Sequence, residues 1–185
     1  MEQLAKLEHW VHDKVKNVPH LPENVRKWLG ANAWWIVLVG VVVGGISLLF
    51  AFGGLLVLAS LIGAVSSSYY VLGGPTAWTV ITSLIALLFS AGIVVLNGLA
   101  IQPLRKMQKK GWVLLFLSWL LAIVSIVVNG ILSLNPFSFI FGLIFGAIAA
   151  AIAGYFLFEI HGQFSHDKTA VKGAKKAPAK KAKKA

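Results

Sequence analysis

The polar residues that could do chemistry in this chain are few. Asn97 and Asn129 interrupt long apolar runs, and Glu159 stands beside His161 at the end of the last such run. Buried amides need hydrogen-bond partners in hydrocarbon, so contacts between helices are their expected use, with a permeation or ligand role for Asn97 as the alternative. Ion-coupled transporters keep an ionisable residue at depth. We therefore interpret Glu159 as an interfacial group paired with nearby lysines, and proton coupling as the alternative.

A cluster of potential metal ligands lies near the start of the sequence, where Glu8 and Asp13 flank His9 and His12. Three- and four-residue spacing places such ligands on one face of a helix. Histidines also serve as amphipathic interfacial residues, which is the interpretation we favour. The sequence has no cysteine, no HExxH motif and no glycine-rich phosphate loop. We therefore predict no catalytic residue, no metal and no cofactor, and a protein that is not an enzyme.

The composition is typical of a polytopic membrane protein. Hydrophobic residues make up 58% of the 185 residues and charged residues 12%, whereas soluble domains carry about 25% charged residues. The run from Trp28 to Leu104 has no charge at all, and it is far longer than the ~20 apolar residues that cross a bilayer. It must hold more than one span, and we expect the first to be an uncleaved anchor.

A basic island from Gln102 to Trp112 sets the expected topology. Its four cations are the only charged residues between Lys27 and Glu159. Cytoplasmic loops carry an excess of Lys and Arg, so two spans before the island, following a cytoplasmic N-terminus, place these cations inside. Three spans would place them outside. The nearly apolar segment from Gly53 to about Ser68 is then a long extension of the first helix, or a bent or re-entrant piece.

Two spans before the island and two after it predict an all-α, four-helix transmembrane bundle. The chain then has three regions. Residues 1–30 form a cytoplasmic amphipathic helical segment, and residues 31–162 form the four-span domain. Residues 163–185 form a Lys/Ala-rich cytoplasmic tail, which we expect to be disordered because it cannot bury enough apolar surface to offset the entropy of ordering it. Both termini then face the cytoplasm of a cell (plasma or inner) membrane. The spans are expected at about 33–53, 76–101, 112–132 and 137–160.

Local signals mark where these helices begin and end. Pro22 suits the first turn of a short second helix, and Gly30 lets the chain turn toward the membrane. Asn32 is the expected N-cap of the first span. Gln102-Pro103 is the expected stop of the second span, and Leu134-Asn135-Pro136 is a tight turn between the third and fourth.

Two patterns indicate how the spans meet. Counting from the basic island places Asn97 near the depth of Ser118 and Tyr155, and Asn129 near Thr82 or Ser83.

Small residues allow close helix approach in lipid. Packing within the bundle is their favoured use, and a homodimer face is the alternative. They recur on the first and fourth spans at Gly40, Gly44, Gly142, Gly146, Ala150 and Gly154.

The tail and the island together predict one basic cytoplasmic surface. Cations near an anionic leaflet favour binding, so inner-leaflet lipid or a partner is the expected contact. The Ala- and Pro-spaced lysines also look like the tails of histone-type and nucleoid proteins, which makes nucleic acid the alternative partner. The residues of this surface are Arg105, Lys106, Lys109, Lys110, Lys175, Lys176, Lys180, Lys181, Lys183 and Lys184.

Short motifs in the second half of the chain resemble a known group. These are KGW at 110–112 followed by LLF at 114–116, and YFLFEI at 155–160. They resemble a group of uncharacterised small bacterial four-helix integral membrane proteins, from which the sequence departs at Glu159 and in its tail. The resemblance implies a fold and no activity. We expect a non-enzymatic membrane protein of structural or accessory type, with a small-solute transporter or channel component and a nucleic-acid tether as alternatives.

Overall fold

The computed structural model describes residues 20–64 and 77–164, and these are almost entirely helical. Within them, four helices are long and apolar enough to cross a membrane, which confirms the all-α class. Residues 1–19 of the amphipathic segment and residues 165–185 of the lysine tail lie outside the described residues. The helices are α2 (Glu23–Ala64), α4 (Ala77–Arg105), α5 (Lys109–Leu132), α6 (Pro136–Glu159) and the short α7 (His161–Phe164).

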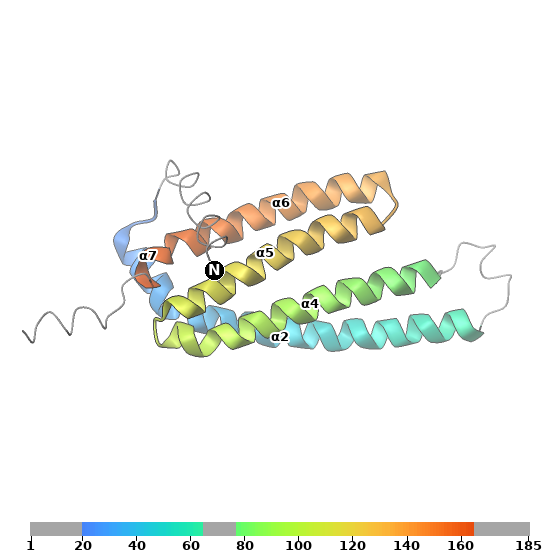
Figure 1. Ribbon diagram of the computed structural model, residues 1–185, viewed down its shortest axis with the longest axis horizontal. Helices are drawn as coiled ribbons and strands as arrows, with labels where there is room; N and C mark the ends of the chain where they lie inside the picture. Colours follow the sequence, from blue (N-terminus) through green and yellow to red (C-terminus); the bar gives the residue numbers. More distant parts are fainter. Residues whose placement is uncertain (1–19, 65–76, 165–185) are drawn as a thin grey trace, which may run out of the picture.

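The four long helices run antiparallel, each beside the next in the chain (Figure 1). The start of α2, the α4–α5 turn and α7 lie at one end, which we call the charged end. The α5–α6 turn, the end of α2 and the start of α4 lie at the other, the uncharged end. Every Lys, Arg and Glu of the described residues belongs to the charged end.

Helix α2 is longer than a bilayer requires. Its 42 residues extend over about 63 Å at 1.5 Å per residue, roughly twice the thickness of the hydrocarbon core. The helix passes through Gly53-Gly54 without a break and reaches Ala64. In lipid an unbroken helix keeps each backbone N–H bonded, which outweighs the weak helix propensity of paired glycines. The structure therefore shows a helix extension up to Ala64.

The predicted boundary near Gly30 is wrong, because α2 begins at Glu23 and continues through this residue. Gly30 instead allows a close contact with α7. A Cβ atom at this position would lie 2.9 Å from Cγ of Gln163. Asn32 is not an N-cap either, since it lies inside the helix and its Nδ2 donates to the Trp28 carbonyl at 2.9 Å.

The turn between α5 and α6 follows the sequence signals closely. Leu134 has a φ of 50°, and Asn135 caps α6 by accepting from the N–H groups of Phe137 and Ser138. Pro136 is the first residue of α6, where its missing N–H costs nothing.

The turn at the charged end differs from the prediction. Helix α4 passes Pro103 and ends at Arg105, so the expected stop is slightly too early. Met107 then reverses the chain with a φ of 54°, and Gln108 N–H donates to the Pro103 carbonyl at 2.9 Å. A Cβ at Gly111 would lie 2.6 Å from the Leu104 backbone nitrogen. The tight turn therefore requires a glycine at this position.

The core lies toward the charged end, around Trp112 of α5, which is fully buried. Its ring stacks on Phe116 with centroids 5.3 Å apart and meets the edges of Phe158 and His161. Its indole N–H donates to the Leu157 carbonyl of α6 at 2.8 Å. Because this buried donor has no water to bond, the contact fixes α5 against the end of α6.

The small-residue ridge of α6 packs against α5 over part of its length. Cβ atoms built at Gly146 and Gly154 would meet Ile126 at 2.6 Å and Trp119 at 2.9 Å, whereas one at Gly142 would meet nothing within 4 Å. Between the two packed glycines, the Ala150 carbonyl accepts from Trp119 Nε1 at 2.9 Å.

Of the two small residues on α2, Gly44 and Gly40, only one packs against another helix. A Cβ at Gly44 would lie 3.0 Å from Cγ2 of Val94 on α4, and one at Gly40 would meet nothing within 4 Å. Packing within the chain therefore accounts for Gly44, Gly146 and Gly154. Gly40 and Gly142 face open space.

The packing of α6 gives a matched test. Gly146→Leu should destabilise the fold by about 1–3 kcal/mol because its side chain must displace Ile126. Gly142→Leu makes the same change in the same helix, and we expect it to be close to neutral. Thermal unfolding in a mild detergent measures both variants, and an equal loss of Tm in the two would contradict this packing.

Candidate functional site

Asn97 and Ser118 form a polar pair between α4 and α5. The Ser118 hydroxyl lies 2.8 Å from Asn97 Oδ1 and 2.9 Å from the carbonyl of Leu115. Ser118 is 6% exposed, while Asn97 is half-buried. This is the interhelical contact that counting from the basic island predicts.

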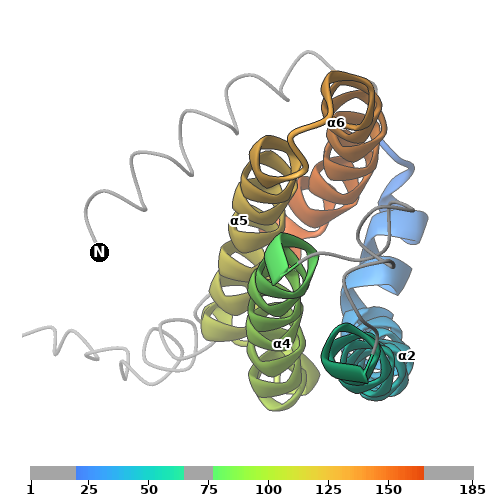
Figure 2. The same ribbon diagram turned by 90° about the vertical axis from the view of Figure 1, so that its right-hand side faces the viewer.

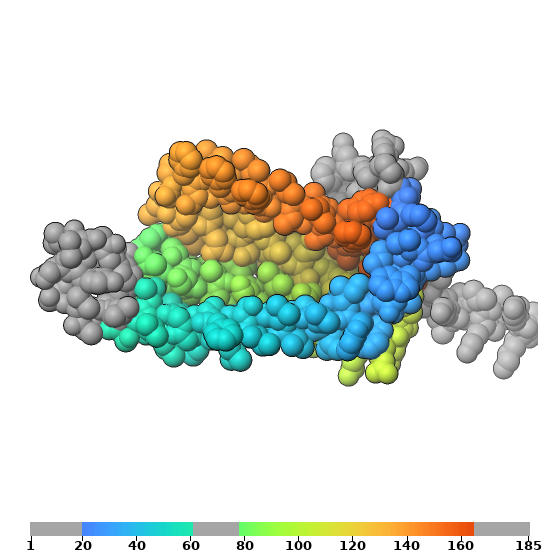
Figure 3. Space-filling model, turned by 180° about the vertical axis from the view of Figure 1, so that it is seen from behind, coloured from blue at the N-terminus to red at the C-terminus, as the bar shows by residue number. Residues whose placement is uncertain are grey.

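Asn97 and Ser118 lie on the floor of a cavity of about 590 Å³. Its walls come from all four long helices and are otherwise apolar. Consecutive helices pack on one another, whereas α2 and α6 make no comparable contact within the described residues. Figure 3 shows the resulting face, on which α4 and α5 lie recessed between α6 and α2. Side chains that enclose the pair include Ala33, Val37, Trp119, Ala153 and Phe156.

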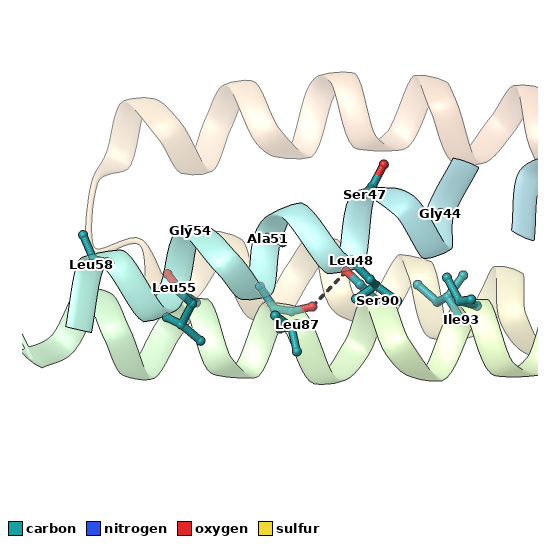
Figure 4. Close-up of a pocket in the computed structure, with 13 residues that line it drawn as sticks. Gly44, Ser47, Leu48, Ala51, Gly54, Leu55, Leu58, Leu87, Ser90 and Ile93 are labelled. Carbon is teal, nitrogen blue, oxygen red and sulfur yellow. Dashed lines mark hydrogen bonds between the residues drawn. The ribbon is translucent and has the colours of Figure 1, made fainter. Parts of the chain in front are cut away.

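A second cavity, of about 610 Å³, continues toward the uncharged end between α2 and α4. Figure 4 shows Leu48, Leu55 and Leu87 among the side chains that line it. Ile93 lines both cavities, so together they follow one face of α4. We call the two cavities the groove.

The polar atoms along the groove differ in whether they are satisfied. Ser83 and Ser90 precede Asn97 at seven-residue intervals, which is two helical turns, so all three share one face of α4. The two serine hydroxyls donate to backbone carbonyls of their own helix, at 2.7 and 2.9 Å. Of these three side chains, the amide of Asn97 is the one that keeps an unused N–H donor.

The groove is closed at the charged end by contacts between distant parts of the chain. Glu159 Oε1 lies 2.7 Å from Nδ1 of His20, and Glu159 Oε2 lies 3.7 Å from Nε of Arg26. The Glu159 side chain is 1% exposed. The contact of Gly30 with Gln163 lies one helical turn further along α2. Figure 2 shows the first turns of α2 leaning toward the end of α6.

These partners correct the interpretation of Glu159 as an acid paired with lysines. The buried carboxylate meets a histidine and an arginine, and His161 packs on Trp112. His20 and Glu159 are separated by 139 positions. No spacing rule connects residues so far apart, although a lone acid beside an apolar run signals that some partner must exist.

Among the described residues, Asn129 makes no hydrogen bond to Thr82 or Ser83. Its Nδ2 donates to the Ser125 carbonyl at 2.8 Å and lies 3.0 Å from the Ser125 hydroxyl, both in α5. Thr82 and Ser83 donate to Thr79 in their own helix. The prediction of an interhelical bond for Asn129 is therefore wrong, because a residue one turn away satisfies the amide first.

The four island cations are exposed at the charged end. The Arg105 guanidinium lies 5.4 Å from the ring centre of Trp34 on α2, a cation–π distance. On α2, Lys27 pairs with Glu23 at 2.7 Å. The tail lysines and the His9–His12 cluster lie outside the described residues. Within residues 20–64 and 77–164, no group of three potential ligands could hold a metal ion.

Comparisons with protein families, curated proteins and solved structures find no match to this chain. The class of protein therefore has to be read from the fold. Its four apolar helices are compatible with a multi-pass membrane protein. The resemblance to small bacterial four-helix membrane proteins stays a prediction.

The carboxylate of Glu159 gives a test of the closed end. Glu159→Gln keeps the shape but leaves Arg26 without its countercharge, and we expect a loss of about 1–3 kcal/mol. Glu23→Gln is the control, because Glu23 and Lys27 form an exposed pair on one helix, which contributes little. Thermal unfolding in detergent compares the two. A Tm for Glu159→Gln equal to that of the unmodified chain would contradict a stabilising role.

Proposed function

We propose that this chain is a non-enzymatic integral membrane protein of structural or accessory type, which presents a basic cytoplasmic surface to anionic lipid. In this proposal it crosses the cell membrane four times with both termini inside. The observation that carries the proposal is the charge distribution. Six Lys and Arg residues and two Glu residues lie at the charged end, and the described residues of the uncharged end carry no charge.

The two acids of the described residues at the charged end are both paired with other residues of that end. Glu23 is paired with Lys27, and Glu159 is buried against His20 and Arg26. The island cations are exposed. They lie at the last residue of α4, in the turn, and at the first two residues of α5, so in this proposal they lie close to the membrane surface. An anionic leaflet attracts each such cation by about 1 kcal/mol.

The tail would add to the same surface, because it begins at the charged end. Phe164, the last described residue, lies at the charged end in α7. Eight lysines follow it in the sequence without an acid after Asp167. Lipid is the anion nearest to a tail that is tethered to a membrane, which is the reason for preferring lipid over nucleic acid.

Tryptophan quenching tests the preference for anionic lipid. The full chain is reconstituted in vesicles that contain brominated phosphatidylglycerol or brominated phosphatidylcholine at the same fraction. The quenching is that of all seven tryptophans, of which Trp34 lies beside Arg105 of the island. The charge-removing variant combines Arg105→Gln, Lys106→Gln, Lys109→Gln and Lys110→Gln. We expect its relative association constant for the anionic lipid to fall at least fivefold, roughly the equivalent of one cation at about 1 kcal/mol.

The control preserves charge while it changes the same positions, by combining Lys106→Arg, Lys109→Arg and Lys110→Arg. It should retain the preference for phosphatidylglycerol. Equal quenching by the two lipids in the unmodified chain, or an unchanged preference in the charge-removing variant, would overturn the proposal.

A further inference from the structure

We propose that the groove binds a neutral lipid with a ring and a long chain, of the isoprenoid quinone type, which accepts a hydrogen bond from Asn97. This inference concerns the groove and is independent of the basic surface. It depends on four features: an unpaired amide group, its depth, the shape of the groove, and the direction from which the groove is open.

The unpaired group belongs to the Asn97 amide. An amide offers two N–H donors and one carbonyl acceptor. Its contact with Ser118 uses one end of the group. At least one N–H therefore stays without an acceptor among the described residues, whichever way the amide is turned. Because Asn97 lines a cavity that is otherwise mostly apolar, a ligand carbonyl bound there would give this donor a partner.

The depth of Asn97 selects the class of lipid. Asn97 precedes Arg105 by eight residues in α4, which is about 12 Å along the helix. Ser118 lies six residues beyond Trp112, or about 9 Å below that tryptophan. A phospholipid keeps its headgroup and ester groups in the interfacial region, near the tryptophan belt. A carbonyl that reaches Asn97 must belong to a molecule neutral enough to carry it into the hydrocarbon.

The shape of the groove fits a ring followed by a chain. The cavity of about 590 Å³ around Asn97 has Trp119 and Phe156 among its walls, and these offer aromatic faces and edges to a flat ring. The cavity of about 610 Å³ continues from Ile93 between the apolar side chains of α2 and α4. The hydroxyls of Ser83 and Ser90 already bond within α4, and the other lining side chains are apolar apart from Ser47, which suits a hydrocarbon chain.

The groove is accessible from the side. At the charged end, Glu159, His20 and Arg26 together with the contact of Gly30 and Gln163 join α2 to α6 and α7. Between α2 and α6 the face is hollowed along the length of the helices (Figure 3). A ligand therefore enters from the lipid phase between α2 and α6, which favours a lipid over a water-soluble solute.

A decyl-substituted benzoquinone is a suitable probe, because a quinone that lies against Trp119 should quench its fluorescence. Decylbenzene, which has a six-membered ring and the same chain but no carbonyl, measures the apolar contribution by competition. Titrations use the full chain in detergent. We expect the quinone to bind at least about tenfold more tightly than decylbenzene, the ratio expected for one hydrogen bond of ordinary strength.

Three variants separate the hydrogen bond from the shape of the groove. Asn97→Leu should weaken quinone binding about tenfold and leave decylbenzene unchanged. Asn129→Leu makes the same substitution at an amide satisfied within α5, and should leave both probes unchanged. Ala153→Phe fills the cavity from α6 and should weaken both probes while the Asn97–Ser118 pair stays intact.

Two results would overturn the inference. The first is decylbenzene binding as tightly as the quinone, which would mean that the groove accepts only hydrocarbon chains. The second is quinone binding that neither Asn97→Leu nor Ala153→Phe weakens, which would mean that the probe binds outside the groove. Should Asn97→Leu fail to fold, the probe comparison in the unmodified chain and Ala153→Phe still decide the outcome.

Discussion

Hydrocarbon does not solvate charge, and the arrangement of this chain depends on that constraint. A single Arg or Lys at the centre of a spanning helix costs about 2.5–3.5 kcal/mol on insertion. Between Lys27 and Glu159 the only charges are those of the turn after α4. Glu159 is the one acid buried at the charged end, where His20 and Arg26 meet it. One end of the molecule therefore collects the charge, and the rest can remain in lipid.

The same end also holds the helices together. Trp112, its aromatic neighbours and its bond to the Leu157 carbonyl join α5 to α6, and the contacts of Glu159 and Gly30 bring in α2. Toward the uncharged end α2 packs on α4, and α6 packs on α5. The groove between α2 and α6 follows from this arrangement. Lipid gives apolar helix surfaces no hydrophobic driving force to associate, so helices that are joined only at one end leave a space that lipid can fill.

Much of the fold could be predicted from sequence, because charge and length act locally. The four spans follow from the apolar runs on either side of the island and of the turn at Asn135. Depth placed Asn97 near both Ser118 and Tyr155, and the structure shows the bond to Ser118. Gly30 and Asn32 misled the prediction, since in α2 tertiary contact and lipid outweigh local helix-breaking tendency. The pairing of His20 with Glu159 and the groove depend on how helices far apart in the sequence lean, which no local pattern encodes.

The proposed cytoplasmic position of the charged end can be tested with a single cysteine. The sequence has no cysteine, so Gln108→Cys introduces one unique thiol in the turn between α4 and α5. A thiol reagent that does not cross membranes is applied to intact cells and then to opened ones. If the charged end is cytoplasmic, the reagent labels the Gln108→Cys thiol only after the cells are opened. Labelling of Gln108→Cys in intact cells would contradict it and invert the topology.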